Sequence, residues 1–181
     1  MTKVAFQGEL GAYSEEAVSA FFGEDVELIP CRGFIDVVTA VVDGHADRGV
    51  LPVENSIIGR VIAGADAAST VGLRVLNKIA LPIHHCLLAP PGANLEGLQR
   101  VLSHPAAIAQ CSRFLRAHPR IEVIEWYDTA GAARDVALSS DPSTSAIASR
   151  RAAERYKLDV LLEGVEDNAS NETSFVLVEK H

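Results

Sequence analysis

The sequence predicts an α/β protein made of two successive series of strands and helices. Short apolar runs alternate with amphipathic segments along its 181 residues, the pattern of strands and covering helices in largely parallel sheets. The second series begins at Pro82, and one further apolar strand follows residue 170. Hydrophobic residues make up 48% of the chain, which is enough to build a packed core and is unlike a disordered segment.

Three strands are expected in the first series. Apolar runs at residues 4–6, 26–29 and 49–53 predict them. Pro52 lies inside the third run and has no N–H to donate to a neighbouring strand. It therefore predicts a position near a sheet edge or a strand end.

Three helices are expected between and after these strands. The first starts near Ser14, whose hydroxyl can cap it, and stops at Gly23. Residues 57–70 are expected to form the third, although they contain Gly59 and Gly64. The second has the most regular pattern, a single buried stripe formed by Phe34, Val37, Val38, Val41 and Val42.

The second series repeats the alternation. Its strands are expected at residues 83–89, 101–102, 121–124 and 145–148, and the return strand at residues 174–178. A helix from Pro105 has Ser103 or His104 as its cap and buries Ile108, Cys111, Phe114 and Leu115. Two more helices are expected at residues 130–138, capped by Asp128 and Thr129, and at residues 150–156.

Charge and composition restrict the partners. The formal net charge of −8 repels nucleic acid and anionic lipid surfaces, so neither is an expected partner. The chain has no visible targeting segment and no apolar run long enough to cross a bilayer, which predicts a cytoplasmic protein. Three widely spaced cysteines predict free thiols in a reducing compartment.

No metal site is expected. The candidate ligands His84, His85 and Cys86 are adjacent, and adjacent strand residues point to opposite faces of a sheet. Cys111 lies far along the chain, and no pair of cysteines has the close spacing of a zinc site.

The start of a second series at Pro82 and the late return strand predict two lobes. The first is expected to comprise residues 1–78 and 167–181, and the second residues 79–166. Two lobes joined by crossing segments leave a cleft, where small ligands usually bind.

Four short polar segments lie where an α/β fold exposes side chains, at strand ends. The turn at residues 8–14 offers backbone N–H groups to an anion, or only makes a tight turn. Residues 54–56 form either a binding segment or a solvated loop. His104 either caps a helix or binds a ligand together with Gln110. Thr173 either packs in its strand or directs its hydroxyl into a cleft.

Taken together, these segments resemble the prephenate dehydratase family from end to end. The matching stretches keep their order and spacing: AFQGELGAYSEEA, F-x-DVV, ADRGVLPVENSIIG, LPIHHCLLA, VLSHPAAIAQC, YDTAGAARDVA, AIASRRAAERY and NETSF. The resemblance implies a two-lobed fold like the type 2 periplasmic binding proteins, with the active site between the lobes. It also implies conversion of prephenate to phenylpyruvate, water and CO₂ without a cofactor, by a homodimer.

The same resemblance assigns the site residues. Thr173 matches the threonine of the family's Thr-Arg-Phe motif and is expected to hydrogen-bond the leaving hydroxyl. Glu54, Asn55 and Gln110 are expected to position the substrate as further catalytic residues. The expected substrate-binding residues are Gly11, Ala12, Tyr13, Ser14, Ser56, Arg60, Ser103, His104, Ser174 and Phe175.

The sequence departs from the family pattern at three places. Ser174 stands where the motif has arginine, and serine does not replace a bidentate contact to a carboxylate. Arg60 stands where the family usually has a small residue. It is expected either to supply the missing charge or to be an ordinary surface residue. Lys78 stands where many relatives have glutamate. The sequence also lacks a segment that matches the regulatory ACT domain, so feedback by phenylalanine is not expected unless another chain supplies that domain or the sequence is part of a longer one.

Three alternatives stay open. A prephenate decarboxylase would retain the ring hydroxyl, and the loss of the arginine favours it while Thr173 argues against it. A cytoplasmic sensor of the same fold would bind the ligand without turnover. Arogenate, the aminated analogue of prephenate, is a further possible substrate.

Overall fold

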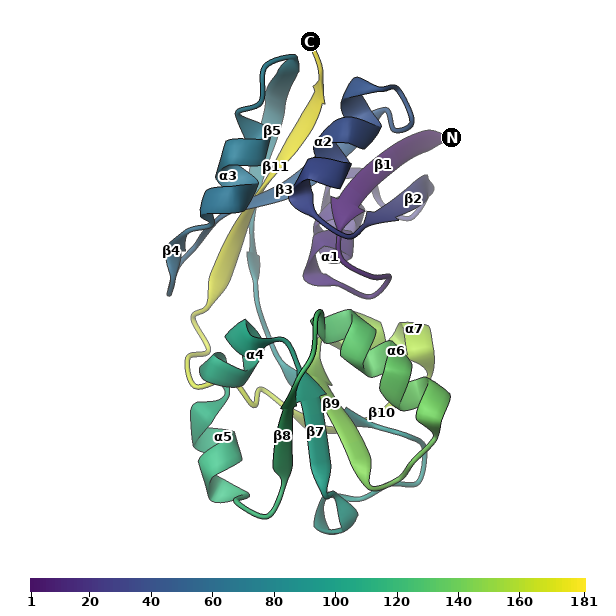
Figure 1. Ribbon diagram of the computed structural model, residues 1–181, viewed down its shortest axis with the longest axis vertical. Coiled ribbons are helices and arrows are strands. Elements are labelled where there is room, and N and C mark those ends of the chain that lie inside the picture. The colour runs from purple at the N-terminus through teal and green to yellow at the C-terminus, as the bar shows by residue number, and fades with distance from the viewer. The chain divides into compact units, whose positions relative to one another are not determined.

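The computed structural model describes all residues from Met1 to His181 and divides them into two compact units. Unit 1 comprises Met1–Glu9, Tyr13–Ile83 and Ser170–His181. Unit 2 comprises Leu10–Ala12 and His84–Ala169. Figure 1 labels their strands and helices.

Unit 1 is built on one mixed sheet with three covering helices. Its elements are β1 (Thr2–Gln7), α1 (Tyr13–Phe22), β2 (Val26–Cys31), α2 (Phe34–Val42), β3 (Arg48–Asn55), β4 (Gly59–Arg60), α3 (Ile62–Ala68), β5 (Leu73–Pro82) and β11 (Glu172–Lys180). The strand order is β2-β1-β3-β11-β5, with β4 paired to β3. β1 pairs in parallel with β2 and β3, whereas β11 runs antiparallel to both β3 and β5. The sheet is therefore parallel only where helical crossovers connect its strands.

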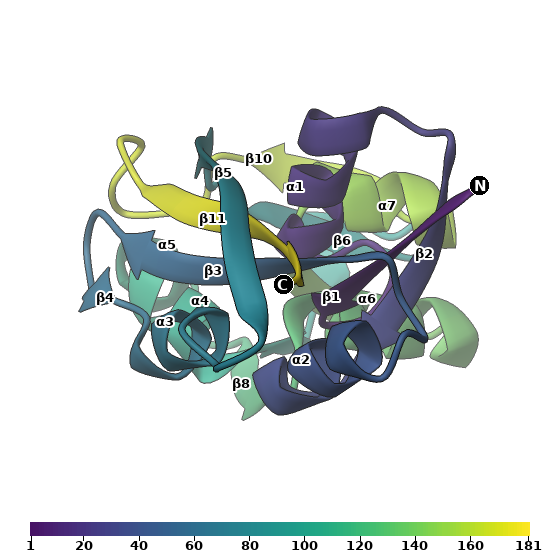
Figure 2. The same cartoon turned by 90° about the horizontal axis from the view of Figure 1, so that it is seen from above.

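The helices of unit 1 cover both faces of the sheet. Figure 2 shows α1 on one face and α2 and α3 on the other. The stripe expected for α2 is confirmed, because Val37, Val38 and Val41 are buried. They pack in one cluster with Leu51 of β3 and with Val176 and Val178 of β11. Even-numbered residues of β11 thus face α2 and α3.

The segment after β3 differs from the single helix expected at residues 57–70. Gly59 has φ +79, a conformation open to glycine, and with Arg60 it turns back to pair with β3. Helix α3 follows only at Ile62. At Gly64, an added Cβ would lie 1.9 Å from the carbonyl oxygen of Pro52, so only glycine lets this helix approach the strand.

Pro52 lies within β3 but beyond the part of the strand that pairs with β1, which ends at Val50. Its missing N–H therefore breaks no bond to β1. Proline is instead accommodated beside an irregularity in the pairing with β11, where Ser174 lies opposite Glu54 and Phe175 lies opposite Pro52.

Unit 2 has a second mixed sheet with helices on both faces. Its elements are β6 (Cys86–Ala89), η1 (Leu95–Gly97), β7 (Arg100–Ser103), α4 (Pro105–Gln110), α5 (Ser112–Ala117), β8 (Glu122–Glu125), α6 (Thr129–Ser139), β9 (Thr144–Ala148), α7 (Arg150–Tyr156) and β10 (Asp159–Glu163). The strand order is β10-β6-β9-β7-β8. β7 pairs in parallel with β8 and β9, and β6 runs antiparallel to β9 and β10.

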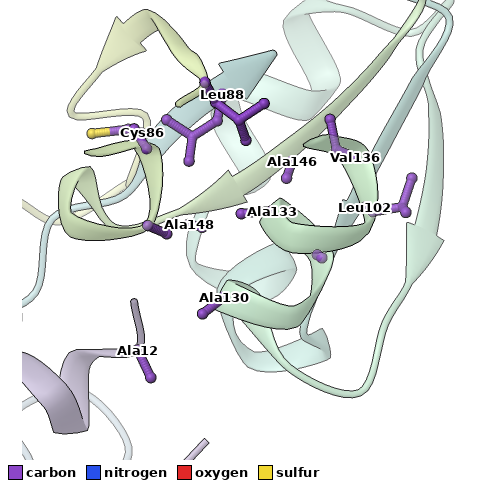
Figure 3. Packing of buried hydrophobic residues seen from close by; sticks show 13 residues of the cluster. Ala12, Cys86, Leu88, Leu102, Ala130, Ala133, Val136, Ala146 and Ala148 are labelled. Carbon is purple, nitrogen blue, oxygen red and sulfur yellow. The ribbon is translucent and has the colours of Figure 1, made fainter. Parts of the chain in front are cut away.

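Two apolar clusters form the core of unit 2. Figure 3 shows the first, which contains Cys86 and Leu88 of β6 and Ala130 and Ala133 of α6. The alternate β6 residues Leu87 and Ala89 belong to the other cluster, which is covered by α4 and α5. The small alanines of α6 let this helix pack closely on the sheet.

Two sequence expectations need correction here. The strand expected at residues 83–89 begins only at Cys86. The helix expected from Pro105 is two helices, α4 and α5, because Cys111 has φ −113 and ψ 26 and interrupts the helix. The cap at His104 is confirmed, since its Nδ1 accepts from the N–H of Ala106 at 3.1 Å.

Candidate functional site

In unit 1, Asn55 and Thr173 lie side by side at the adjoining ends of two strands. Asn55 ends β3 and Thr173 follows the first residue of β11, and the register pairs the two directly. Asn55 Nδ2 donates to Thr173 Oγ1 at 2.9 Å and to Asn171 Oδ1 at 2.8 Å. Both Asn55 and Thr173 are buried.

The orientation of the Asn55 amide follows from its other contacts. Its Oδ1 accepts from the backbone N–H groups of Ile57 at 2.9 Å and Ile58 at 3.1 Å. Because those two donors require an oxygen, the amide nitrogen must face Thr173 and Asn171. Asn55 thus uses both sides of its carboxamide to fix the strand end.

The Thr173 hydroxyl accepts a hydrogen bond from Asn55 and keeps its own proton to donate. No group of the chain accepts that proton. A hydroxyl that accepts a hydrogen bond is polarised and becomes a better donor itself. This arrangement suits donation to an oxygen atom of a ligand.

Ser56 holds the start of β11 against the end of β3. Its backbone N–H donates to the carbonyl of Glu172 at 2.9 Å, and its Oγ accepts from the N–H of Glu172 at 2.9 Å. The hydroxyl expected to bind substrate therefore serves the backbone next to Thr173.

Glu54 and Ser174 lie on the other face of the sheet from Thr173. β11 pairs with β5 without irregularity from Glu172 to Leu177, so side chains alternate and Ser174 shares a face with Val176. Glu54 lies directly opposite Ser174. Its carboxylate contacts Lys78 Nζ at 3.2 Å, and both side chains are about half exposed. The structure does not bring Glu54 together with Thr173.

Arg60 is held by a partner within its own segment. It lies opposite Glu54 across β3 and β4, but its guanidinium pairs with Asp66 of α3 at 3.0 Å. Phe175, which was expected to bind substrate, is only 2% exposed and belongs to the interior of unit 1.

The expected glycine turn is divided between structural roles. Gly11 has φ +93, and an added Cβ would lie 2.9 Å from Cα of Ala152. Its carbonyl accepts from Ser149 Oγ at 2.7 Å, which fixes the turn on the start of α7. Ala12 packs in the first cluster of unit 2. Tyr13 and Ser14 are the first two residues of α1, so Ser14 lies inside the helix and is not its cap.

In unit 2, the expected site residue Gln110 is contacted through both its side chain and its backbone. It ends α4, and its Oε1 lies 2.8 Å from Nε2 of His85, which is 2% exposed. Its backbone carbonyl accepts from the N–H of Asp167 at 2.7 Å. Both contacts come from segments far from α4 in the sequence.

Glu166 and Asp167 organise this part of unit 2. Glu166 accepts from the N–H of His85 at 2.9 Å and contacts His84 Nδ1 at 2.8 Å. Burial alone would raise the pKa of Glu166, but these hydrogen bonds outweigh it and hold the pKa below its usual value. Asp167 accepts from the N–H of Ser112 at 3.1 Å and from its Oγ at 2.6 Å, so it caps α5.

Ser103 and His104 contribute to local structure. Ser103 is fully buried and donates to the carbonyl of Ile147 at 2.6 Å, which ties β7 to β9. His104 is exposed and caps α4 through Nδ1.

Sequence reasoning did not single out His85, Glu166 or Asn171 as residues that hold the site. His85 was weighed only as a metal ligand, and no three His, Cys, Asp or Glu side chains gather as such a site. The available signal was the fully buried strand Cys86–Ala89 directly after it, which places this histidine at the edge of a core. None of the helices combines the length and apolar character that crossing a membrane requires.

Known proteins resemble the chain over almost its whole length. The profile of the family described as prephenate dehydratase matches residues 4–181. Arogenate dehydratase 1 of Petunia hybrida is 44% identical over 179 residues, which are 97% of this chain and 42% of that protein. Arogenate dehydratase/prephenate dehydratase 6, chloroplastic, of Arabidopsis thaliana is 43% identical over 97% of this chain and 43% of its own length. The chain thus spans less than half of these curated relatives.

Solved structures support the same relationship. A prephenate dehydratase from Arthrobacter aurescens, solved in complex with L-Phe, has a TM-score of 0.90 and 31% identity over 99% of this chain and 61% of that one. GqqA, described as a novel type of quorum quenching acylase, has a TM-score of 0.88 and 34% identity over 99% of this chain and 64% of its own.

The fold class expected from the sequence is confirmed. A periplasmic substrate-binding protein of an ABC transporter from Coxiella burnetii has a TM-score of 0.50 at 14% identity, over 99% of this chain and 84% of that one, a likeness of fold alone. The two α/β units, the family profile and the relatives above agree, and the chain belongs to the prephenate dehydratase family.

Proposed function

We propose that this chain catalyses the decarboxylative dehydration of prephenate to phenylpyruvate. The observation that carries the proposal is the 2.9 Å hydrogen bond from Asn55 Nδ2 to Thr173 Oγ1, because it leaves the threonine hydroxyl as a polarised donor. Family membership supplies the class of substrate, and the Asn55–Thr173 pair supplies the group that the reaction needs.

For this reaction the protein has to orient the substrate and to supply one hydrogen-bond donor. The bond from the ring to its carboxylate breaks and releases CO₂, and its electron pair enters the ring. The bond from C4 to the hydroxyl breaks at the same time, and the hydroxide takes up one proton and leaves as water. Thr173 donates its hydrogen bond to that departing oxygen, and the proton consumed is replaced from solvent. A well-placed donor of this kind accelerates such a step by about 10²–10⁴-fold.

Asn55 acts in this mechanism through Thr173. Its amide nitrogen holds the threonine Oγ1, and its oxygen is fixed by the N–H groups of Ile57 and Ile58. The threonine hydroxyl is therefore oriented before substrate binds, which lowers the cost of forming the reactive complex. Gln110 of unit 2 is proposed to bind a carboxylate of the substrate through its amide N–H groups.

Arogenate is the second candidate substrate. Curated relatives at 43–44% identity carry the name arogenate dehydratase, one of them together with prephenate dehydratase. The ring chemistry is the same for both compounds, so the Asn55–Thr173 pair serves either. Arogenate carries an ammonium group where prephenate has a keto oxygen, and its product is phenylalanine.

The test is incubation of the purified protein with prephenate and, separately, with arogenate near neutral pH. Products are separated by chromatography and identified by mass against a reaction without enzyme. Catalytic formation of phenylpyruvate supports the proposal, and phenylalanine from arogenate alone moves the assignment to the second candidate. A non-aromatic product that retains the hydroxyl, or tight binding without turnover, would contradict both.

Two variants assign the chemistry to the threonine. Thr173→Val keeps the shape of the side chain and removes its donor, so kcat should fall by about 10²-fold or more while the protein stays folded. Thr39→Val is the matched control, because Thr39 is exposed on α2. Equal turnover by the two variants would remove Thr173 from the mechanism.

A further inference from the structure

Asn55 is buried, and every hydrogen-bonding position of its carboxamide is occupied. Its Nδ2 donates to Thr173 Oγ1 at 2.9 Å and to Asn171 Oδ1 at 2.8 Å. Its Oδ1 accepts from the backbone N–H groups of Ile57 at 2.9 Å and of Ile58 at 3.1 Å. The direction of the amide nitrogen therefore depends on the turn that brings these two N–H groups to the oxygen.

The two backbone donors permit only one orientation of the Asn55 amide. A backbone N–H always donates, so the group that faces Ile57 and Ile58 has to be the oxygen. Turning the carboxamide over would place its NH₂ group against both donors and leave them without an acceptor. As long as the turn keeps its shape, the amide nitrogen faces Thr173.

The turn consists of residues 56–58, between β3 and β4, and Gly59 closes it. Gly59 lies directly opposite Asn55 in the pairing of these strands. Its φ of +79 is in the left-handed region, which residues with a Cβ rarely adopt. The N–H of Val61 then donates to the carbonyl of Val53 at 3.0 Å, so the hairpin continues beyond the glycine. With this backbone angle, the chain reverses within three residues and keeps both N–H groups beside the side chain of Asn55.

We infer that Gly59 is a positioning residue for Thr173. The left-handed turn that it permits brings two backbone N–H groups to Asn55 Oδ1, and they direct the amide nitrogen to the threonine hydroxyl. The inference rests on the proposed function, because it assumes that this hydroxyl donates to the departing oxygen of the substrate. It adds that the φ angle of one exposed glycine sets the direction of the donor.

Gly59→Ala tests the inference, and Gly72→Ala is its matched control. Gly72 is also exposed, has φ +95 and lies in the turn before β5, and an added Cβ at either glycine meets nothing within 4 Å. Each substitution therefore disfavours a left-handed turn without a clash and should lower Tm by about 2–4 °C. Only Gly59→Ala should lower kcat, by about tenfold with little change in KM, because only this turn holds Asn55.

Three comparisons can overturn the inference. The first is unchanged kcat in Gly59→Ala, or an equal loss of kcat in Gly72→Ala. The second is Gly59→Asn, the milder variant, which should recover most of the loss because asparagine adopts the left-handed region more readily than alanine. Equal losses in the two variants would mean that the φ angle is not the cause. In a Thr173→Val background, Gly59→Ala should lower kcat no further, and additive losses would show that Gly59 acts without Thr173.

Amide hydrogen exchange gives a readout that does not depend on turnover. The N–H groups of Ile57 and Ile58 should exchange slowly in the intact chain, although the residues are 45% and 62% exposed, because both donate to Asn55. Gly59→Ala should accelerate both about tenfold, and Gly72→Ala should not. Equal exchange in Gly59→Ala and the wild type would overturn the inference. If the protein turns over neither prephenate nor arogenate, the proposed function fails, and this exchange still decides whether Gly59 holds the turn on Asn55.

Discussion

Lys78 Nζ lies 3.2 Å from Glu54 Oε2 although a whole strand separates the strands that carry them. The residue of that middle strand opposite Glu54 is Ser174, whose small side chain leaves room for the lysine to reach across. Lys78 lies opposite Val176 and therefore on the same face as Ser174. The side chain of Lys78 thus extends over Ser174, the position where the family motif has arginine.

This arrangement predicts that a cation at position 174 can replace Lys78. Lys78→Ala should lower the free energy of unfolding by less than about 1 kcal/mol, the range for exposed ion pairs. In a Ser174→Arg background the same substitution should cost nothing, because arginine at 174 reaches Glu54 on the same face. Urea unfolding of the four proteins measures the coupling, and strictly additive changes would show that the two cations do not share Glu54.

Asn55→Asp predicts a loss of activity through Thr173. The carboxylate still accepts from the N–H groups of Ile57 and Ile58, but it cannot donate to Thr173 Oγ1, so the threonine proton is drawn toward the aspartate. We expect kcat to fall by about 10²-fold with little change in KM. Asn77→Asp, an exposed position on β5, serves as the control in steady-state assays. A variant with unchanged kcat would show that the orientation of Thr173 does not matter.

Glu179 predicts a difference between buried and exposed ion pairs. Its side chain is 11% exposed and contacts Arg48 Nη2 at 2.8 Å and Arg74 Nε at 2.6 Å, which joins β3, β11 and β5. Glu179→Ala removes hydrogen bonds to two arginines that are 34% and 58% exposed and should cost about 1–2 kcal/mol. Glu27→Ala removes a half-exposed pair with Lys3 and should cost less than about 0.5 kcal/mol. Equal changes in urea unfolding would contradict the burial of Glu179.

The buried His85 predicts a loss of stability in mild acid. Its folded pKa lies below the unfolded value near 6.5, so the unfolded chain binds the proton more readily. The contribution of His85 is complete above about pH 6.5 and is lost as the pH falls toward its lowered folded pKa. In chemical unfolding at pH 7.5 and 5.5, His85→Gln should therefore lose less stability than the wild type over this interval. A larger loss in the variant would argue against a neutral buried histidine.

The cysteines predict a fixed order of reaction with thiol reagents. Burial, aided by Glu166 and Asp167, raises the pKa of the Cys111 thiol to about 12. Cys86 and Cys111 are both buried, whereas Cys31 is partly exposed. Because the thiolate is the reactive form, only Cys31 should react with a disulfide reagent in the native protein at pH 8. Peptide mass analysis identifies the labelled residue, and native labelling of Cys111 would contradict its burial.

The helices were predicted better than two of the strands, for a physical reason. The α2 stripe and the caps at His104 and Asp128 are local signals, and the structure confirms them. β5 and β10 were not predicted at all. Each contains an irregularity in pairing, between Val75 and Asn77 in β5 and between Val160 and Leu162 in β10. Such a bulge breaks the period of two by which a strand is recognised.

The site itself was visible in the sequence only in part. The sequence placed Asn55 and Thr173 at strand ends, but their direct pairing depends on the antiparallel register of β3 and β11. The partners of Gln110 are His85, which lies 25 residues before it, and Asp167, which lies near the end of unit 2. No local pattern around α4 carries that information, because tertiary contacts alone bring the segments together.

Strand β11 has a consequence for the order in which the protein is made. It lies in the middle of the unit 1 sheet, between β3 and β5, yet the ribosome completes it only after every residue of unit 2. Until residues 172–180 have been synthesised, the edges of β3 and β5 that pair with β11 have no partner strand, and Asn55 cannot bond to Thr173. Unit 2, whose strands lie together between residues 86 and 163, can fold in the meantime. The hydrogen bond between Asn55 and Thr173 can therefore form only after the last strand of unit 1 has been synthesised and has inserted between β3 and β5.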